Sequence, residues 1–309
     1  MRQREVWIDV VKGIGIVAVV LGHVLSTQVG ILWHIPLFFI LAGYNCHPTD
    51  IWPYIKKLTR RLLIPYFVWL FGILLLQCVL NKSMGESVFV EALKDAMYGG
   101  VRLSGVFGVF WFITVLYFML IGLQLLLMKG LRWWMVGVLI AIGYLPMFFH
   151  VVWPWNIQVV PMALAYGCTG ALLKKTIDGF GNQVKWYWLA MGLLVLAALS
   201  LIPALNVNMK YNDFGMPVVS FLASVFCSLV IFVLAKRCEN VRWFSVPLSW
   251  FGRGSLVVMY VHVLVFCELV KMTDNLWICA LAVLAISMVI YQVVEVLKRW
   301  TGSMKIKDS

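Results

Sequence analysis

Charged residues are scarce in this chain. They make up 12% of its 309 residues, and hydrophobic residues make up 63%. A typical soluble domain has about 25% charged residues. A chain of this length with so few charges cannot present a polar surface to water on all sides. The composition therefore excludes an ordinary soluble protein and predicts an integral membrane protein.

Several patterns typical of other protein classes are missing. The seven cysteines include no C-x-x-C pair, so the sequence predicts neither a metal site nor a disulfide framework. No internal repeat or low-complexity tract occurs. The first apolar run follows Arg2 and Arg4, as in a signal peptide, but no A-x-A-like cleavage site precedes Trp33. We expect this run to remain as a helix.

What the chain does contain is a series of apolar runs from one end to the other. A transmembrane helix needs about 20 predominantly apolar residues, and several of these runs are shorter. The sequence predicts an all-α integral membrane fold, with one membrane domain over residues 1–309 and ten transmembrane helices. A short surface helix is expected in the connection 81–106. The ten runs lie near residues 11–28, 32–47, 62–80, 107–128, 132–149, 157–173, 184–204, 216–235, 249–270 and 276–297.

The basic residues orient this series. With the N-terminus inside, the outer segments hold five of the 25 Lys and Arg residues, and the cytoplasmic segments hold the other twenty. Such an excess on the cytoplasmic side follows the positive-inside rule and predicts that both termini are cytoplasmic. Anionic lipid headgroups explain the net charge of +12, so no nucleic-acid partner is expected. The five outer residues are Lys82, Lys94, Arg102, Lys210 and Lys271.

The first apolar run carries two ionisable side chains, which are costly inside a bilayer and so mark candidate sites. Lys12 and His23 are eleven residues apart, which places them within about 20° of the same helix face and about 16 Å apart along the axis. Asp9 precedes Lys12 by three residues and can pair with it. A snorkelling lysine and a packing histidine would give the same pattern, so the spacing alone leaves both interpretations open.

Two further groups of polar residues follow in the next runs. His34 begins the second run, and the short connection before it predicts that His34 lies near His23 toward the outer side. The basic stretch from Lys56 to Arg61 precedes the third run. Such a stretch fits a phosphate-bearing ligand or lipid headgroups, and the charge by itself favours headgroups.

The later runs add an aromatic stripe and a second histidine. Trp111 and its aromatic neighbours are more often packing residues than a site. The ninth run carries Tyr260, His262 and Glu268. Glu268, as a buried carboxylate, would need a partner or would have to stay protonated.

Together these segments resemble the acyltransferase-3 family of membrane proteins, which O-acylate sugars. The start of the chain is most similar to the fucose-O-acetylase-like branch. Members commonly have arginine at the position of Lys12, and lysine lacks the bidentate guanidinium fork. The resemblance rests on Trp7-Ile8-Asp9-Val10-Val11-Lys12-Gly13 leading to Gly22-His23, on His34-Ile35-Pro36-Leu37-Phe38-Phe39 through Gly43-Tyr44, on the basic run before Pro65-Tyr66, on Trp111-Phe112-Ile113, and on Gly252-Arg253-Gly254-Ser255-Leu256 followed by Tyr260 and His262.

The resemblance implies a ten-helix acyltransferase core in which His23 is catalytic, with His34 as a second candidate. It implies no permanently bound cofactor, but an acyl-CoA donor that enters from the cytoplasm. We expect its phosphates near four basic side chains, and five further residues as supports of the substrate or the site. The basic four are Lys12, Lys57, Arg60 and Arg61, and the supports are Asp9, Trp111, Tyr260, His262 and Glu268.

The expected reaction transfers an acyl group, most simply acetyl, to a hydroxyl of a cell-envelope sugar, lipid-linked glycan or polysaccharide precursor. The resemblance suggests a bacterial cytoplasmic (inner) membrane. His23 could act as a general base or form an acyl-histidine, and the sequence leaves both routes open. A transporter or flippase is the main alternative, since intramembrane charges also mark substrate paths. Against it, no inverted repeat or pair of broken helices is found. A non-enzymatic scaffold is a third class, and it gives no reason for histidines within the membrane.

Overall fold

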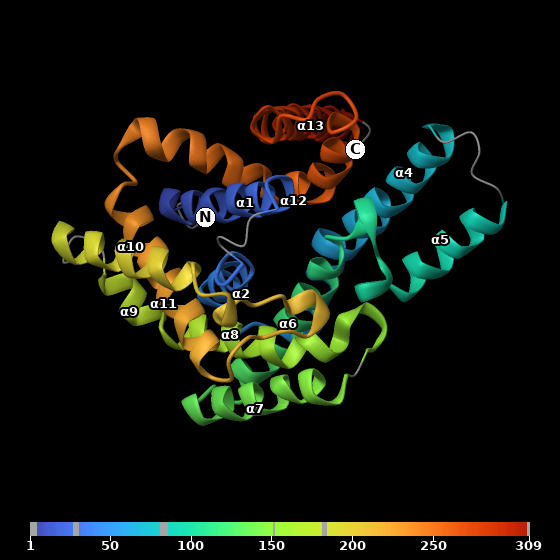
Figure 1. Ribbon diagram of the computed structural model, residues 1–309. Helices are drawn as coiled ribbons and strands as arrows, with labels where there is room; N and C mark the ends of the chain where they lie inside the picture. Colours follow the sequence, from blue (N-terminus) through green and yellow to red (C-terminus); the bar gives the residue numbers. More distant parts are fainter. Residues whose placement is uncertain (1–4, 27–30, 81–85, 151, 181–183, 308–309) are drawn as a thin grey trace. The chain divides into compact units, whose positions relative to one another are not determined.

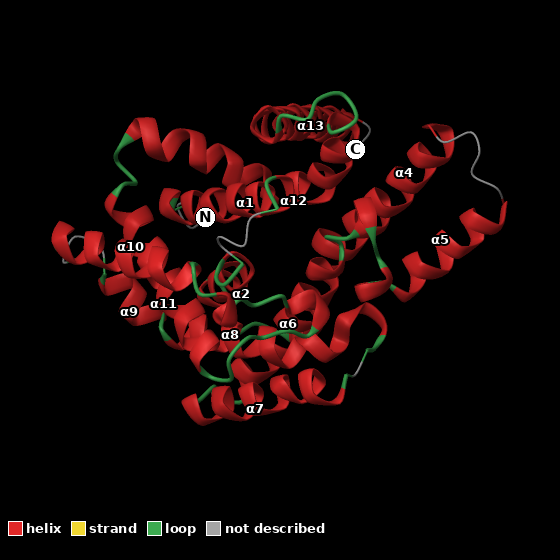
Figure 2. Cartoon of the chain, viewed as in Figure 1, coloured by secondary structure: helices red, strands yellow, loops and turns green. Residues whose placement is uncertain are grey.

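The structure is a computed structural model that describes residues 5–26, 31–80, 86–150, 152–180 and 184–307. The regular elements of these residues are helices, apart from a single antiparallel bridge between Asn208 and Asp213 (Figures 1 and 2). The chain divides into two compact units. We call Met1–Thr27 with Cys238–Ser309 the terminal unit, and Gln28–Arg237 the central unit.

The terminal unit contains three long helices: α1 (Val6–Val24), α12 (Arg242–Leu269) and α13 (Leu276–Lys307). In Figure 1, α1 lies along α12.

The central unit contains the remaining helices and several short turns. Its main helices are α2 (His34–Tyr44), α3 (Ile51–Leu58), α4 (Ile64–Leu80), α5 (Glu86–Tyr98), α6 (Trp111–Met128), α7 (Trp133–Phe149), α8 (Val160–Leu172), α9 (Lys174–Gly179), α10 (Trp186–Ser200) and α11 (Val219–Arg237). A π-helical turn, η1 (Thr59–Leu63), joins α3 to α4, and short 3-10 turns are η2 (Gly100–Arg102), η3 (Gly105–Phe107), η4 (Pro154–Val159), η5 (Pro203–Leu205) and η6 (Met209–Tyr211).

Each of the ten predicted apolar runs coincides with a helix. The end of the first run, at residues 27 and 28, lies outside the described residues. The helix α5 confirms the short helix expected in the connection 81–106. Six segments are long and apolar enough to cross a membrane: Val6–Val24, Ile51–Val79, Gly105–Met128, Val219–Arg237, Arg242–Leu269 and Leu276–Trp300. The helices α2, α7 and α10 are apolar but shorter, so ten crossings stay a prediction.

Two glycines bring α1 and α12 into close backbone contact. A methyl group at Gly13 would overlap the carbonyl oxygen of Leu248, and one at Gly252 would overlap that of Asp9. Small residues allow helix backbones to approach in this way within membranes. The contact is reciprocal, so it fixes the position of each helix along the other.

In the central unit, side-chain hydrogen bonds connect both ends of four helices, α2, α6, α8 and α11. Near their N-terminal ends, one bond joins α11 to the start of α2 and another joins α6 to η4, which leads into α8. Near their C-terminal ends, three bonds join residues that end or follow these helices. The four helices therefore run in the same direction. The bonds are Ser224 Oγ to Leu32 O (2.7 Å), Thr114 Oγ1 to Trp155 O (3.0 Å), Lys174 Nζ to Tyr44 O (2.8 Å), Lys236 Nζ to Ile177 O (2.6 Å) and Gln124 Nε2 to Thr49 O (2.5 Å).

A buried lysine joins the connections that precede three of these helices, α6, α8 and α11. Lys210 is 9% exposed, and its ammonium group donates a hydrogen bond to the carbonyl oxygen of Leu103 at 2.7 Å. Asn156 Nδ2 donates in turn to the Lys210 carbonyl oxygen at 3.0 Å. Burial lowers the pKa of Lys210 below its ordinary value.

Candidate active site

In the terminal unit, two histidines lie side by side. The ring centroids of His23 on α1 and His262 on α12 are 5.2 Å apart, and the ring planes are tilted by 51°. His23 is exposed, whereas His262 is completely buried. One ring is therefore accessible from outside the protein, and the other packs beside it in the interior.

The backbone of α12 fixes the ring of His262. Its Nδ1 lies 2.9 Å from the carbonyl oxygen of Val258 and 3.0 Å from that of Met259. Carbonyl oxygens only accept hydrogen bonds, so Nδ1 must carry the proton. The other nitrogen, Nε2, is enclosed and has no hydrogen-bond partner among the described residues.

The glycine contact between the two helices sets the register of this pair. His23 follows Gly13 by ten residues on α1, and His262 follows Gly252 by ten residues on α12. Two contacts at the same spacing on both helices require that α1 and α12 run in the same direction. The backbone contact at one level therefore brings the two rings together about 15 Å further along, at a rise of 1.5 Å per residue.

The predicted pairing of Asp9 with Lys12 is confirmed. Lys12 Nζ lies 3.6 Å from Asp9 Oδ1, with the Asp9 side chain 5% exposed and the Lys12 side chain 30% exposed. A buried carboxylate thus holds a partly accessible ammonium group on α1, beside the close contact with α12. This arrangement can offer a positive charge to an anionic ligand near the N-terminal part of α1.

In the central unit, the basic cluster lies on and beside a π-helical turn. Lys57, Arg60 and Arg61 are exposed, and η1 carries both arginines. The hydroxyl groups of Thr59 and Tyr117 form a 3.0 Å hydrogen bond that attaches this turn to α6. Helical turns of the π type are rare and occur frequently at functional sites. The turn and the preceding Lys57 present exposed cationic groups of the kind that bind phosphate.

Comparison with known proteins decides the class. A family model described as an acyltransferase domain, that of the acyltransferase-3 family, matches residues 5–294. The chain belongs to this family. It is an integral membrane acyltransferase, as the family and the apolar helices together indicate. Among curated proteins and among solved structures, none matches the chain.

The other predicted site residues of this acyltransferase are divided between the two units. Tyr260 is completely buried in the terminal unit, and Trp111 is 7% exposed at the start of α6 in the central unit. His34 also belongs to the central unit, with its ring 6.5 Å from that of Trp33. Its expected proximity to His23, which lies in the terminal unit, stays a prediction.

The expectation of a buried carboxylate at Glu268 is wrong. The Glu268 side chain is 51% exposed in the last turn of α12 and forms an ion pair with Lys271 at 2.8 Å. The helix ends at Leu269, so the carboxylate lies where the chain leaves the helix and the lysine three residues on can reach it. Its negative charge is thus already neutralised by a neighbour.

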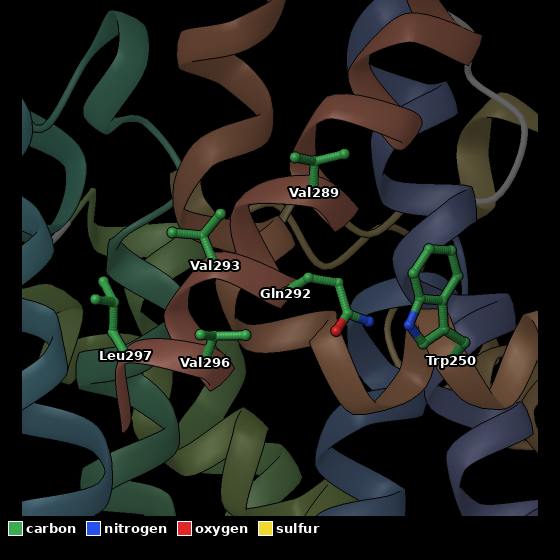
Figure 3. A pocket seen from close by; sticks show the side chains of 6 residues that line it. All are labelled: Trp250, Val289, Gln292, Val293, Val296 and Leu297. Atoms are coloured by element: carbon green, nitrogen blue, oxygen red, sulfur yellow. The ribbon is translucent and has the colours of Figure 1, made fainter. Parts of the chain in front are cut away.

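A hollow of about 330 Å³ on the terminal unit does not fit the acyl-CoA phosphates. In Figure 3, Trp250 of α12 and Gln292 of α13 lie beside each other, and the rest of its lining is aliphatic. None of the lining residues is charged, so the hollow cannot neutralise phosphates. The aliphatic residues are Val289, Val293, Val296 and Leu297.

One contact in the candidate site, that between His23 and His262, could not be inferred from the sequence. His23 and His262 were both candidates, but their distance of 239 residues along the chain gave no reason to pair them. The signal was the equal spacing of glycine and histidine in Gly13 to His23 and Gly252 to His262. That spacing becomes informative only when both glycines are known to lie in the backbone contact between α1 and α12.

Proposed function

We propose that this membrane acyltransferase transfers an acyl group, most simply acetyl, from cytoplasmic acyl-CoA to a hydroxyl of a cell-envelope sugar or polysaccharide precursor. The observation that carries the proposal is the exposed ring of His23, which is placed against a buried histidine. Neutral imidazole is a good general base near neutral pH, and the accessible ring leaves room for the hydroxyl. The fucose-O-acetylase-like branch and a bacterial inner membrane are part of this proposal.

The donor binds through its phosphates. Lys12, held by Asp9, is the candidate for this role in the terminal unit, and Lys57, Arg60 and Arg61 are the candidates in the central unit. Lys12 lies about 16 Å below His23 on nearly the same face of α1, by the helical rise. A donor anchored at Lys12 can therefore extend its flexible arm along α1 and place the thioester beside His23.

The chemistry proceeds by direct transfer. His23 removes the proton from the acceptor hydroxyl as the oxygen attacks the thioester carbonyl carbon, and an oxyanion forms. The carbon–sulfur bond then breaks, the ester remains on the sugar, and the CoA sulfur receives the proton that His23 had taken. Trp111, Tyr260 and His34 are the candidates to orient the acceptor or to stabilise the oxyanion.

The test uses membranes that contain the expressed chain, acetyl-CoA labelled in the acetyl group and a cell-envelope glycan fraction. We expect label in the glycan, released by mild alkali because an O-acetyl ester is alkali-labile, and no label with membranes that lack the chain. Glycan that crosses the membrane without gaining label would instead favour the transporter and would contradict the proposal.

A further inference from the structure

General-base chemistry at His23 leaves the neighbouring histidine without a role. His262 is completely buried, and its Nδ1–H is held by the carbonyl oxygens of Val258 and Met259. A neutral ring that carries its proton on Nδ1 has a lone pair on Nε2. The backbone of α12 therefore turns an accepting nitrogen toward the interior.

That accepting nitrogen has no donor among the described residues. Nε2 of His262 is enclosed, so water cannot reach it without a movement of neighbouring groups. A buried acceptor without a hydrogen bond destabilises the folded protein. A group that persists at this cost requires an explanation, and a role in function is one.

The ring of His23 is near enough to supply the donor. Its centroid lies 5.2 Å from that of His262, at a tilt of 51°, and the His23 side chain is exposed and so has room to turn. We propose that His262 is a positioning residue whose Nε2 accepts a hydrogen bond from a ring N–H of His23. This bond leaves the second nitrogen of His23 unprotonated and directed to the exposed side, where the acceptor hydroxyl arrives.

The same bond supports His23 while it holds the substrate proton. After His23 takes the hydroxyl proton, it is an imidazolium with two N–H groups. One faces the leaving sulfur, and the other stays on Nε2 of His262, which keeps its own Nδ1 proton throughout. A fixed acceptor behind a catalytic histidine has the same orienting task as the buried carboxylate of a serine hydrolase. This inference rests on the proposed function, since it needs His23 as the base.

Two substitutions separate positioning from packing. His262→Leu fills the site with an apolar side chain and removes the acceptor. His262→Gln places an amide oxygen near the position of Nε2 and keeps an acceptor. We expect His262→Leu to lower kcat about 100-fold, within the range for general-base catalysis, and to leave the KM for acetyl-CoA nearly unchanged. His262→Gln should recover about a tenth of the wild-type kcat, because the acceptor is restored but its geometry is not ideal.

A second measurement needs no acyl donor. In protein labelled with ¹⁵N-histidine, the ring signals of His262 are assigned as those that are missing from the spectrum of His262→Leu. Their chemical shifts should show a protonated Nδ1 and an unprotonated Nε2. The His23 ring shifts should change when His262 is replaced by leucine. His150→Asn, which replaces an exposed histidine with a left-handed backbone, is the control. It should leave both the His23 ring shifts and kcat unchanged.

The outcomes are separable. A His262→Leu protein with wild-type kcat, a protonated Nε2 on His262, or unchanged His23 shifts would each overturn the positioning role. If His262→Leu and His262→Gln lose kcat to the same extent, and thermal stability to the same extent, then His262 is only a packing residue. That result would also overturn the positioning role. Failure of the wild-type protein to acylate any glycan would remove the proposed function instead. In that case the ring shifts still decide whether His262 accepts from His23.

Discussion

At the scale of the residue, the charge of Lys12 should determine donor affinity. Lys12→Met removes the ammonium group and should raise the KM for acetyl-CoA about tenfold, since a hydrogen bond to a charged group contributes about 1.5–3 kcal/mol. Lys12→Arg keeps the charge and the partner of Asp9 and should stay close to wild type. Steady-state kinetics on purified protein test this expectation. Equal KM values for Lys12→Met and wild type would exclude Lys12 from the donor site.

Lys210 predicts a dependence of stability on pH. Burial holds the pKa of its amine below the ordinary value, so the folded chain binds fewer protons than the unfolded chain between the two values. The contribution of Lys210 to the free energy of unfolding therefore rises as pH increases between these two pKa values. The wild type should gain thermal stability relative to Lys210→Met as pH rises toward the ordinary lysine pKa of about 10.4. A constant difference between the two proteins across this range would show that the amine does not titrate as a buried group.

Local pairs were the residue-scale features that could be predicted. Asp9 and Lys12 are three residues apart on one helix, so the helical geometry brings them together without tertiary information. The exposure of Glu268 could not be predicted, because it depends on where α12 ends. The fixed ring of His262 depends on the neighbours of that ring, which no local pattern shows.

At the scale of the element, the crossing of α1 and α12 should be sensitive to one methyl group. Gly13→Ala and Gly252→Ala each place a methyl on a carbonyl oxygen of the other helix. Such overpacking costs about 1–3 kcal/mol and should also separate His23 from His262, with loss of acyl transfer. Gly137→Ala, in α7 with no atom within 4 Å of the added methyl, is the matched control. Thermal unfolding and transfer assays that fail to distinguish the three proteins would contradict this account of the register.

The π-helical turn predicts a milder effect. Tyr117→Phe removes the hydroxyl that holds Thr59 at 3.0 Å and should loosen η1 against α6. Because a neutral hydrogen bond contributes about 1 kcal/mol, we expect a rise of a few-fold in the KM for acetyl-CoA with kcat unchanged. A fall in kcat at constant KM would argue that the turn serves a step other than donor binding.

The existence of the helices followed from the apolar runs, but their lengths did not. Each of the ten runs is helical because an apolar segment without water must satisfy its backbone groups internally. The second run, at 32–47, yields only the 11-residue α2, about 16 Å long, because the chain turns at both ends. A hydrophobicity pattern does not report where such turns begin.

At the scale of the whole molecule, the helix directions agree with the predicted topology. The helices α2, α6, α8 and α11 run in the same direction within the central unit, and α1 and α12 run in the same direction within the terminal unit. The predicted topology requires that the helices of each set cross the membrane in the same direction as one another. A phosphatase reporter inserted after Thr273 should therefore be active outside, and a fluorescent protein fused to the C-terminus should mature inside. An active phosphatase at the C-terminus would invert the assignment.

The site as a whole could be predicted only as a list of residues. The sequence supplied the types and the order of the candidate residues and their resemblance to a family. It did not supply the contact between the two histidines, because that contact depends on how α1 and α12 pack.

The central claim is that His23 carries out the chemistry, and one comparison tests it most directly. Wild type, His23→Ala and His150→Asn are purified in detergent and assayed for acetyl-CoA thioester turnover with a cell-envelope glycan fraction, alongside acetyl-CoA binding. We expect all three to bind the donor, and His23→Ala to lose turnover by at least about 100-fold, while His150→Asn retains it. Full turnover by a folded His23→Ala protein would contradict both the general-base and the acyl-histidine mechanisms.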